Sequence, residues 1–110
     1  MAYDEVLAER VRDELAAEPD LTEKRMFGGL AFLLDGAMAV AVSGQGGLMV
    51  RVERAATDHL VATTQAGPMV MRGRELQGWV RVAADDLRTR RQLVRWLQHG
   101  VAAARASDRA

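Results

Sequence analysis

The segment LAFLLDGAMAVAVSGQGGLMVRV, residues 30–52, decides the fold of this chain. Asp35-Gly36 is a dipeptide typical of a two-residue β-hairpin turn, and Gly44-Gln45-Gly46-Gly47 supplies a second turn. Before the second turn, larger apolar residues alternate with alanines, and after it leucine and valines alternate with methionine and arginine. Such alternation is typical of strands that bury one face. The segment therefore predicts an antiparallel run of strands.

Further elements extend from this segment in both directions. Leu7, Val11 and Leu15 recur every four residues and predict a helix over 3–17. A strand over 24–27, a short helix over 53–64, a second hairpin over 69–82 and a last helix to about residue 105 complete the pattern. The last helix is expected to be capped by Asp85-Asp86 or by Thr89.

The predicted order is α-β-β-β-β-α-β-β-α, or one strand fewer if residues 24–34 form a single bent strand. Because the strands are adjacent in sequence and the helices few, the fold class is α+β. We expect two layers, with three helices mainly on one face of an antiparallel sheet of about five to six strands. Residues 1–106 are expected to form one domain and residues 107–110 a frayed tail.

Composition excludes several classes of protein. The chain has 110 residues and no cysteine, so disulfide frameworks, cysteine zinc sites and thiol catalysis are excluded. Fifteen basic residues balance fifteen acidic ones, which gives no overall charge for binding a polyanion. The acidic start of the chain is unlike a signal peptide, and the longest uncharged run, 36–50, is too short to cross a bilayer. We therefore expect a cytoplasmic location and no contact with a membrane.

No set of residues with a catalytic pattern is visible. His59 and His99 lack a second ligand at metal-binding spacing, and Ser43 and Ser107 lie outside any nucleophile motif. The chain is therefore expected not to be an enzyme and to need no cofactor and no metal.

The second face of the sheet is the candidate binding surface. If Val40, Val50 and Val80 point toward the helices, period-two alternation places the following residues on the other side: Ala39, Ala41, Met49, Arg51, Trp79 and Arg81. A tryptophan between arginines on an uncovered sheet is a platform for a base, an anion or a second copy. In the competing interpretation Trp79 belongs to the core, and a one-residue shift in register would exchange the two faces.

A basic face on the last helix is the second candidate surface. Arg88, Arg91 and Arg95 recur on the side opposite its apolar stripe. Such a face can lie along phosphates, or it can simply be solvated.

The segment Lys24-Arg25-Met26-Phe27-Gly28-Gly29-Leu30-Ala31-Phe32-Leu33, together with Gly47-Leu48-x-Val50-Arg51 and Gly78-Trp79-Val80, resembles the N-terminal domain of the TfoX/Sxy family. The resemblance implies a secretion-chaperone-like α+β fold and a link to competence or transcription regulation. It implies no catalytic residues. Full-length members of that family carry a second, helical domain, and we expect this chain to end where the first domain ends.

The motif residues have a structural interpretation and a functional one. Gly28-Gly29 permits a bend between strands, Gly78 permits a close approach beside Trp79, and Phe27, Phe32 and Met38 fill the core. Alternatively, the bend over residues 25–29 and Trp79 line one concave site.

The leading hypothesis is a non-enzymatic regulatory or adaptor domain that contacts a protein partner, or a second copy in a homodimer. The residues expected to bind this partner are Arg51, Trp79 and Arg81, followed by Arg91 and Arg95. The alternatives are nucleic-acid binding by the arginine faces and binding of a small ligand.

Overall fold

The computed structural model describes residues 3–26 and 28–107 of the chain. Its elements follow the predicted order, with a short 3-10 turn before each of the last two helices. The bounds are α1 Glu5–Leu15, β1 Leu21–Met26, β2 Gly29–Leu34, β3 Ala37–Val42, β4 Leu48–Arg51, η1 Arg54–Ala56, α2 Thr57–Thr63, β5 Gly67–Met71, β6 Arg74–Val82, η2 Ala84–Leu87 and α3 Arg90–Ser107.

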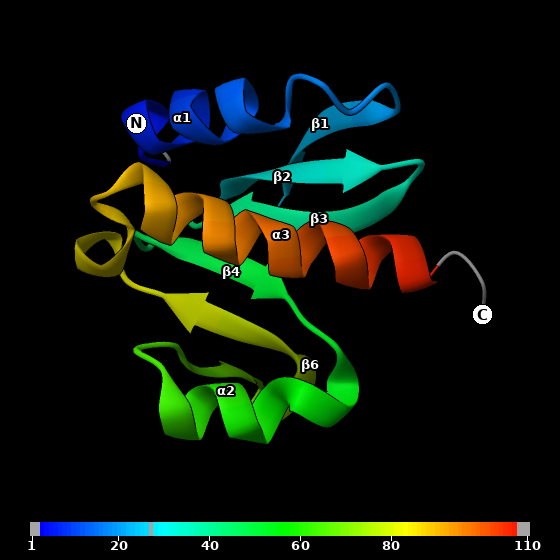
Figure 1. The fold of residues 1–110 in the computed structure, drawn as a ribbon. Helices are drawn as coiled ribbons and strands as arrows, with labels where there is room; N and C mark the ends of the chain where they lie inside the picture. The colour runs from blue at the N-terminus through cyan, green and yellow to red at the C-terminus, as the bar shows by residue number, and fades with distance from the viewer. Residues whose placement is uncertain (1–2, 27, 108–110) are drawn as a thin grey trace.

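The described strands form one six-stranded sheet in the order β1-β2-β3-β4-β6-β5, and every neighbouring pair is antiparallel. Figure 1 shows α3 crossing the front of the sheet, with α1 above it and α2 below. The predicted α+β class, with two layers and three helices, is confirmed. The predicted hairpin turn is also present, since Asp35 and Gly36 both have positive φ angles, 49° and 84°.

Residues 21–34 form two strands rather than one bent strand. Met26 at the end of β1 is paired with Gly29 at the start of β2, and Gly28 between them has a φ angle of 76°. Glycine adopts this left-handed conformation without the steric cost of a side chain. Phe27, which was expected in the core, lies outside the described residues.

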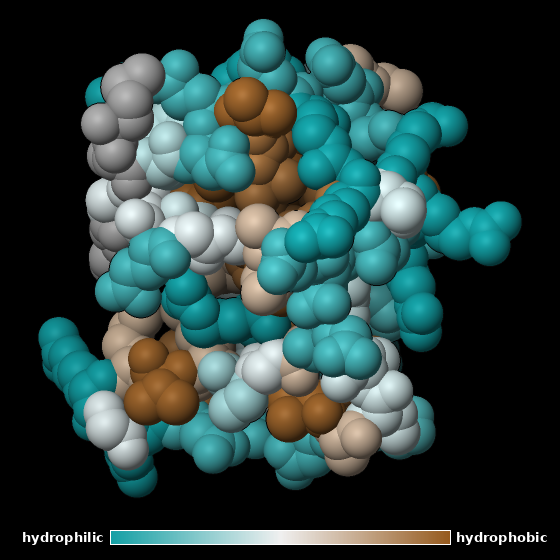
Figure 2. Space-filling view, turned by 90° about the vertical axis from the view of Figure 1, so that its left-hand side faces the viewer, coloured by the Kyte–Doolittle hydropathy of each residue, from teal (hydrophilic) through white to brown (hydrophobic). Residues whose placement is uncertain are grey.

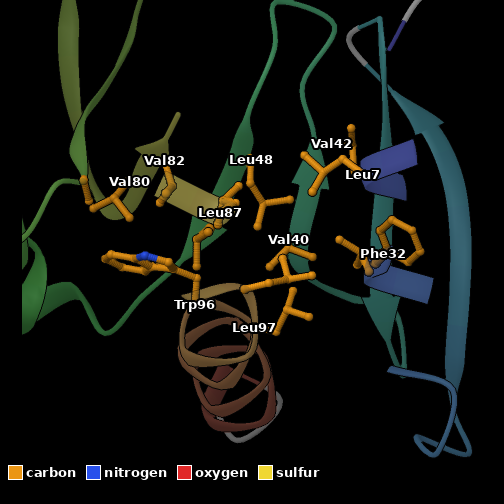
Figure 3. Close-up of a cluster of buried hydrophobic side chains, with 14 of the residues drawn as sticks. Leu7, Phe32, Val40, Val42, Leu48, Val80, Val82, Leu87, Trp96 and Leu97 are labelled. Carbon is orange, nitrogen blue, oxygen red and sulfur yellow. The ribbon is translucent and has the colours of Figure 1, made fainter. Parts of the chain in front are cut away.

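One large hydrophobic core lies between the sheet and the helices. Figure 3 shows Val40, Val80 and Phe32 on the strands facing Trp96 and Leu97 of α3. Helix α1 adds its predicted stripe, and α2 adds a leucine, so all three helices bury side chains against the same face of the sheet.

Two helix starts are fixed by side-chain caps. The Asp4 carboxylate accepts a hydrogen bond of 3.0 Å from the backbone N–H of Leu7 at the start of α1. At α3, the Thr89 hydroxyl accepts from the N–H of Gln92, and the Gln92 side chain accepts from the N–H of Thr89. Thr89 is therefore the cap of the last helix, and the capping box replaces two backbone partners that a helix start lacks.

A β-bulge in β3 corrects the predicted alternation. Phe32 is paired with Val40 and Leu33 with Met38, so Ala39 is an extra residue without a partner in β2. Ala39 is fully buried against Ala104 of α3, on the helical side of the sheet. The predictions that Ala39 points away from the helices and that Met38 fills the core beneath them are wrong, because the bulge exchanges the two faces at this point.

Ser107 is the last residue of α3, and residues 108–110 of the expected frayed tail lie outside the described part of the chain. Among the described helices, none combines the length and the apolar character that crossing a bilayer requires.

Candidate functional site

The face of the sheet that turns away from the helices carries a second apolar cluster. Within the described part of the chain, no helix contributes a side chain to it. We call this surface the methionine face, and it consists of Met26, Ala31, Leu33, Met38, Ala41, Met49, Met69, Met71, Leu76 and Trp79. In Figure 1 it is the side of the sheet that is turned away from the viewer.

The centre of the methionine face is hollowed. Four methionines, Leu76 and Trp79 line a shallow groove of about 240 Å³ over β3, β4, β6 and β5. Met71 is 41% exposed at its rim, whereas Met49 and Met69 form its floor at 8% and 9%. On the adjoining side of the molecule, by contrast, hydrophobic groups are separated by hydrophilic side chains (Figure 2).

Arg51 and Trp79 meet on this face. They are cross-strand partners in β4 and β6, and the Arg51 guanidinium carbon lies 5.8 Å from the centre of the Trp79 ring. Arg51 also donates a hydrogen bond of 3.3 Å to the carbonyl of Met38. Trp79 is half-buried, so it is neither a fully exposed platform nor a residue of the main core. The Trp79 ring forms one wall of the groove. The Arg51 guanidinium lies over this ring, and its contacts with the ring and with the Met38 carbonyl hold it in place.

Arg81 occupies the same face one pleat further along β6. It is the cross-strand partner of Met49, and its guanidinium donates to the Ser43 hydroxyl at 3.1 Å and to the Gly46 carbonyl at 3.5 Å. The glycine-rich turn after β3 therefore orients the Arg81 guanidinium. A strand follows that turn, as the sequence predicts.

The structure separates the two predicted arginine groups. Arg51, Trp79 and Arg81 lie on the methionine face, whereas Arg91 and Arg95 are exposed on α3, which covers the opposite side of the sheet. Arg88 precedes the helix and forms an ion pair with Asp85. Arg91 and Arg95 therefore cannot contribute to the same binding surface as Trp79.

The glycine motif has a structural explanation. A Cβ atom at Gly29 would lie 2.2 Å from the carbonyl oxygen of Val42, so only glycine fits there. Gly78 has a φ angle of 93°, and its N–H donates to the Thr57 hydroxyl at 2.8 Å, which attaches α2 to β6. Gly29 therefore allows a close approach of two backbone segments. A Cβ at Gly78 would meet only the Val52 carbonyl oxygen at 3.8 Å, an ordinary contact, so Gly78 is needed for its positive φ angle and the predicted close approach beside Trp79 is wrong.

The motif residues do not converge on Trp79. Arg25 is paired with Leu30 of the main core and Met26 with Gly29, so neighbouring motif side chains lie on opposite faces. Strand β1 is four strands away from β6, which corresponds to roughly 19 Å across a sheet. The interpretation in which the bend over residues 25–29 and Trp79 line one concave site is wrong for this reason.

Two further observations concern metal-binding side chains and the histidine of α3. Among the described residues, no three His, Asp or Glu side chains gather in one group that could hold a metal ion. Burial lowers the pKa of His99 on α3, and the positive charge of Arg95 lowers it further. Its ring lies 5.3 Å from that of Trp96, on the helical side of the sheet.

Sequence reasoning missed most of the groove. Period-two alternation places Met49 beside Arg51, but Met38, Met69, Met71 and Leu76 were not among the predicted binding residues. Met69 and Met71 alternate within β5, which is the signal that was available. Met38 gave no such signal, because the bulge at Ala39 is invisible in the alternation of alanine with larger residues.

The chain belongs to the TfoX N-terminal domain family, whose model matches residues 13–104. The match covers every described strand, the end of α1, the whole of α2 and most of α3. A comparison with curated proteins found no match.

Proposed function

We propose that this chain is a non-enzymatic regulatory or adaptor domain that binds another protein through the methionine face. The observation that carries the proposal is an apolar, hollowed sheet surface that the described helices leave uncovered. Methionine side chains are flexible and polarisable, so they adapt to the shape of a bound partner. Contiguous apolar surfaces of this kind mark interaction sites in proteins.

The family supports this proposal at a coarser level. Membership in the TfoX N-terminal domain family is consistent with a link to competence or transcription regulation, and we include that link, and a cytoplasmic location, in the proposal. A homodimer through the same face is one form that the protein contact can take. Self-association is therefore the first alternative outcome that a test must separate.

The test compares four purified baits, the wild type and three variants, in an extract of cells that encode the protein. Trp79→Ala and Met71→Lys alter the methionine face, while Arg91→Gln/Arg95→Gln alters the opposite side of the molecule. We expect the wild type and the arginine variant to retain the same protein, and both face variants to lose it while keeping the native circular dichroism spectrum. The interaction is then reconstituted from the two purified proteins, with sedimentation analysis to detect self-association.

An unfolded Trp79→Ala variant would assign Trp79 to the core, and Met71→Lys then carries the test alone, since Met71 is 41% exposed. Retention of every partner by Met71→Lys would contradict the proposed function.

Nucleic-acid binding is the second candidate, because Trp79 lies between two arginines and aromatic rings with cations can stack bases. Anisotropy of labelled random-sequence duplex and single-stranded DNA tests it. Affinity at low salt that falls steeply at near-physiological salt would support this candidate. No binding at low salt would remove it. A thermal-shift screen of nucleotides and metabolites tests the third candidate, a small ligand in the groove.

A further inference from the structure

Four cations border the methionine face. Residues directly opposite each other in neighbouring antiparallel strands point to the same side of a sheet. Lys24 is opposite Ala31, Arg51 opposite Trp79, Arg81 opposite Met49 and Arg74 opposite Met71, and each of these partners belongs to the methionine face. Arg51, Arg81 and Arg74 lie on β4 and β6, two of the strands that line the groove, and Lys24 lies on the edge strand β1, at the margin of the methionine face.

The carboxylates of the strands lie on the other side of the sheet. The six strands contain two, Glu23 and Glu75. Glu23 is opposite Phe32 of the main core, and Glu75 is opposite Val70, which alternates with Met69 and Met71. Neither shares the side that carries the four cations. The sign of the charge on the methionine face is thus uniform along the strands.

The four cations of the methionine face take no part in the ion pairs of the described residues. The five pairs in the structure all involve a residue of α1, α3 or η2, and none includes Lys24, Arg51, Arg74 or Arg81. Arg51 and Arg81 are instead oriented by carbonyl and hydroxyl oxygens. A guanidinium has five N–H donors, so each keeps donors for a carboxylate while its position is already fixed.

We propose that the methionine face binds an amphipathic protein segment whose apolar side chains enter the groove and whose carboxylates border it, close to Arg51, Arg81, Lys24 and Arg74. The inference rests on the proposed function and specifies the chemistry of the partner. Complementary charge fixes the orientation of the segment and accelerates its association, while the groove supplies apolar contact.

The same charges argue against a symmetric homodimer through this face. A two-fold contact brings the same patch of both copies together, so the four cations of one copy would approach those of the other. Like charges across an interface are unfavourable, and no strand carboxylate of the methionine face compensates them. The occupant is therefore a different, acidic segment.

A displayed library of random-sequence linear peptides tests this inference on the intact protein. Peptides selected on the wild type are expected to combine large apolar residues with Asp and Glu. Synthetic versions of them are then measured by fluorescence anisotropy, together with matched peptides in which Asn and Gln replace the acids. We expect the acidic peptides to bind about tenfold or more tightly than their neutral counterparts at low salt, with a smaller difference at near-physiological salt.

Substitutions of the four cations test whether they cause the preference for acidic peptides. Arg51→Gln/Arg81→Gln and, separately, Lys24→Gln/Arg74→Gln are expected to remove most of the preference for acidic peptides. The second pair consists of exposed residues, so its folding is not at risk. Arg91→Gln/Arg95→Gln is the matched control and should leave every affinity unchanged. Met71→Lys should weaken the binding of neutral peptides more than that of acidic ones, because it removes apolar contact and adds a positive charge to the same face.

Other outcomes would contradict the acidic partner alone, or the proposed function as well. Apolar peptides that lack acidic enrichment, depend on Met71 and ignore the arginine substitutions would overturn the acidic partner and leave the proposed function standing. Selection of no peptide that depends on Met71 would overturn both. Self-association that Met71→Lys abolishes would replace the acidic segment by a second copy, and DNA binding that depends on Arg51 and Arg81 would replace it by a nucleic acid.

Discussion

At the scale of single residues, two glycines in the strands differ in what surrounds them. Gly29 stands where β2 approaches β3 so closely that a methyl group would lie 2.2 Å from the Val42 carbonyl oxygen. Gly67, at the start of β5, has no atom within 4 Å of the position that a Cβ would occupy. The residue type is the same, but its physical role is different.

This contrast predicts opposite effects of the same substitution. Gly29→Ala should lower the free energy of unfolding by about 1–3 kcal/mol, because a backbone atom rather than a flexible side chain must move. Gly67→Ala should leave it unchanged or raise it by up to about 1 kcal/mol, because alanine restricts the unfolded chain more than glycine does. Urea titration of both variants measures the difference. Equal stability of the two would show that β2 and β3 are further apart than described.

At the scale of elements, the position of α3 depends on how closely its backbone lies against β3. A Cβ at Gly100 would lie 2.7 Å from both the Ala39 carbonyl oxygen and the Val40 side chain. The bulge that inserts Ala39 therefore meets the one glycine of the helix, and the two features fit each other. Larger residues at either position would separate α3 from the sheet.

The Gly100→Ala variant tests which of two effects dominates. Alanine stabilises a helix interior by about 1 kcal/mol relative to glycine. Overpacking against β3 costs about 1–3 kcal/mol, and we expect it to dominate, giving a net loss of stability. Gln98→Ala, at an exposed position of α3, is the control and should change stability by less than about 0.5 kcal/mol. Thermal and urea unfolding measure both variants, and a more stable Gly100→Ala protein would contradict the close contact.

Ion pairs tether α1 and the segment after it to α3 and β1. Arg90 contacts Glu14 at one end of α3, Arg105 contacts Asp20 and Glu18 at the other, and Arg12 contacts Glu23. Hydrogen bonds from these arginines lower the pKa of Glu14, Asp20 and Glu23. The side chains of the Arg105–Asp20 and Arg12–Glu23 pairs are partly exposed. Because the folded pKa values lie below the unfolded ones, the folded state binds fewer protons in acid.

These carboxylates predict acid sensitivity. Their stabilisation is present above the ordinary pKa values of 4.5 for glutamate and 3.8 for aspartate, and it is lost as the pH falls through the lower folded values. The free energy of unfolding should therefore fall as the pH drops below about 4.5, with a smaller fall in the Glu23→Gln variant. Urea titrations across this pH range measure it. Glu75→Gln, outside the ion pairs of the described residues, is the control, and an equal response of both variants would contradict the assignment.

The order of the elements was predictable because turn dipeptides and hydrophobic periodicity are local signals. Asp35-Gly36 fixed the register of a hairpin, and Leu7, Val11 and Leu15 marked the buried side of α1 correctly. Which side chains form the methionine face was predictable only in part. A bulge depends on the partner strand and on α3. The residues around Met38 and Ala39 therefore gave no indication that each side chain lies on the face opposite to the predicted one.

At the scale of the whole molecule, the sheet has two apolar faces with different surroundings. The main core is sealed by three helices, whereas the methionine face is left uncovered by every described helix and is bordered by cations. This asymmetry also explains why the predicted arginines divided into two groups. Residues that alternate along one strand share a face, and the predicted packing of the helices on the other face already made the arginines of the last helix a separate surface.

The asymmetry predicts that stability and binding can be altered separately. Phe32→Ala, at a fully buried position of the main core, should lower the free energy of unfolding by about 3–5 kcal/mol. Met71→Ala removes a large apolar side chain that is 41% exposed, and should change stability by less than about 0.5 kcal/mol. Urea unfolding measures both values. For Met71→Ala we expect weaker binding of the selected acidic peptides in the anisotropy assay. A strong loss of stability in Met71→Ala would instead make the methionine face a second core, because a side chain that holds the fold together is not available to a partner.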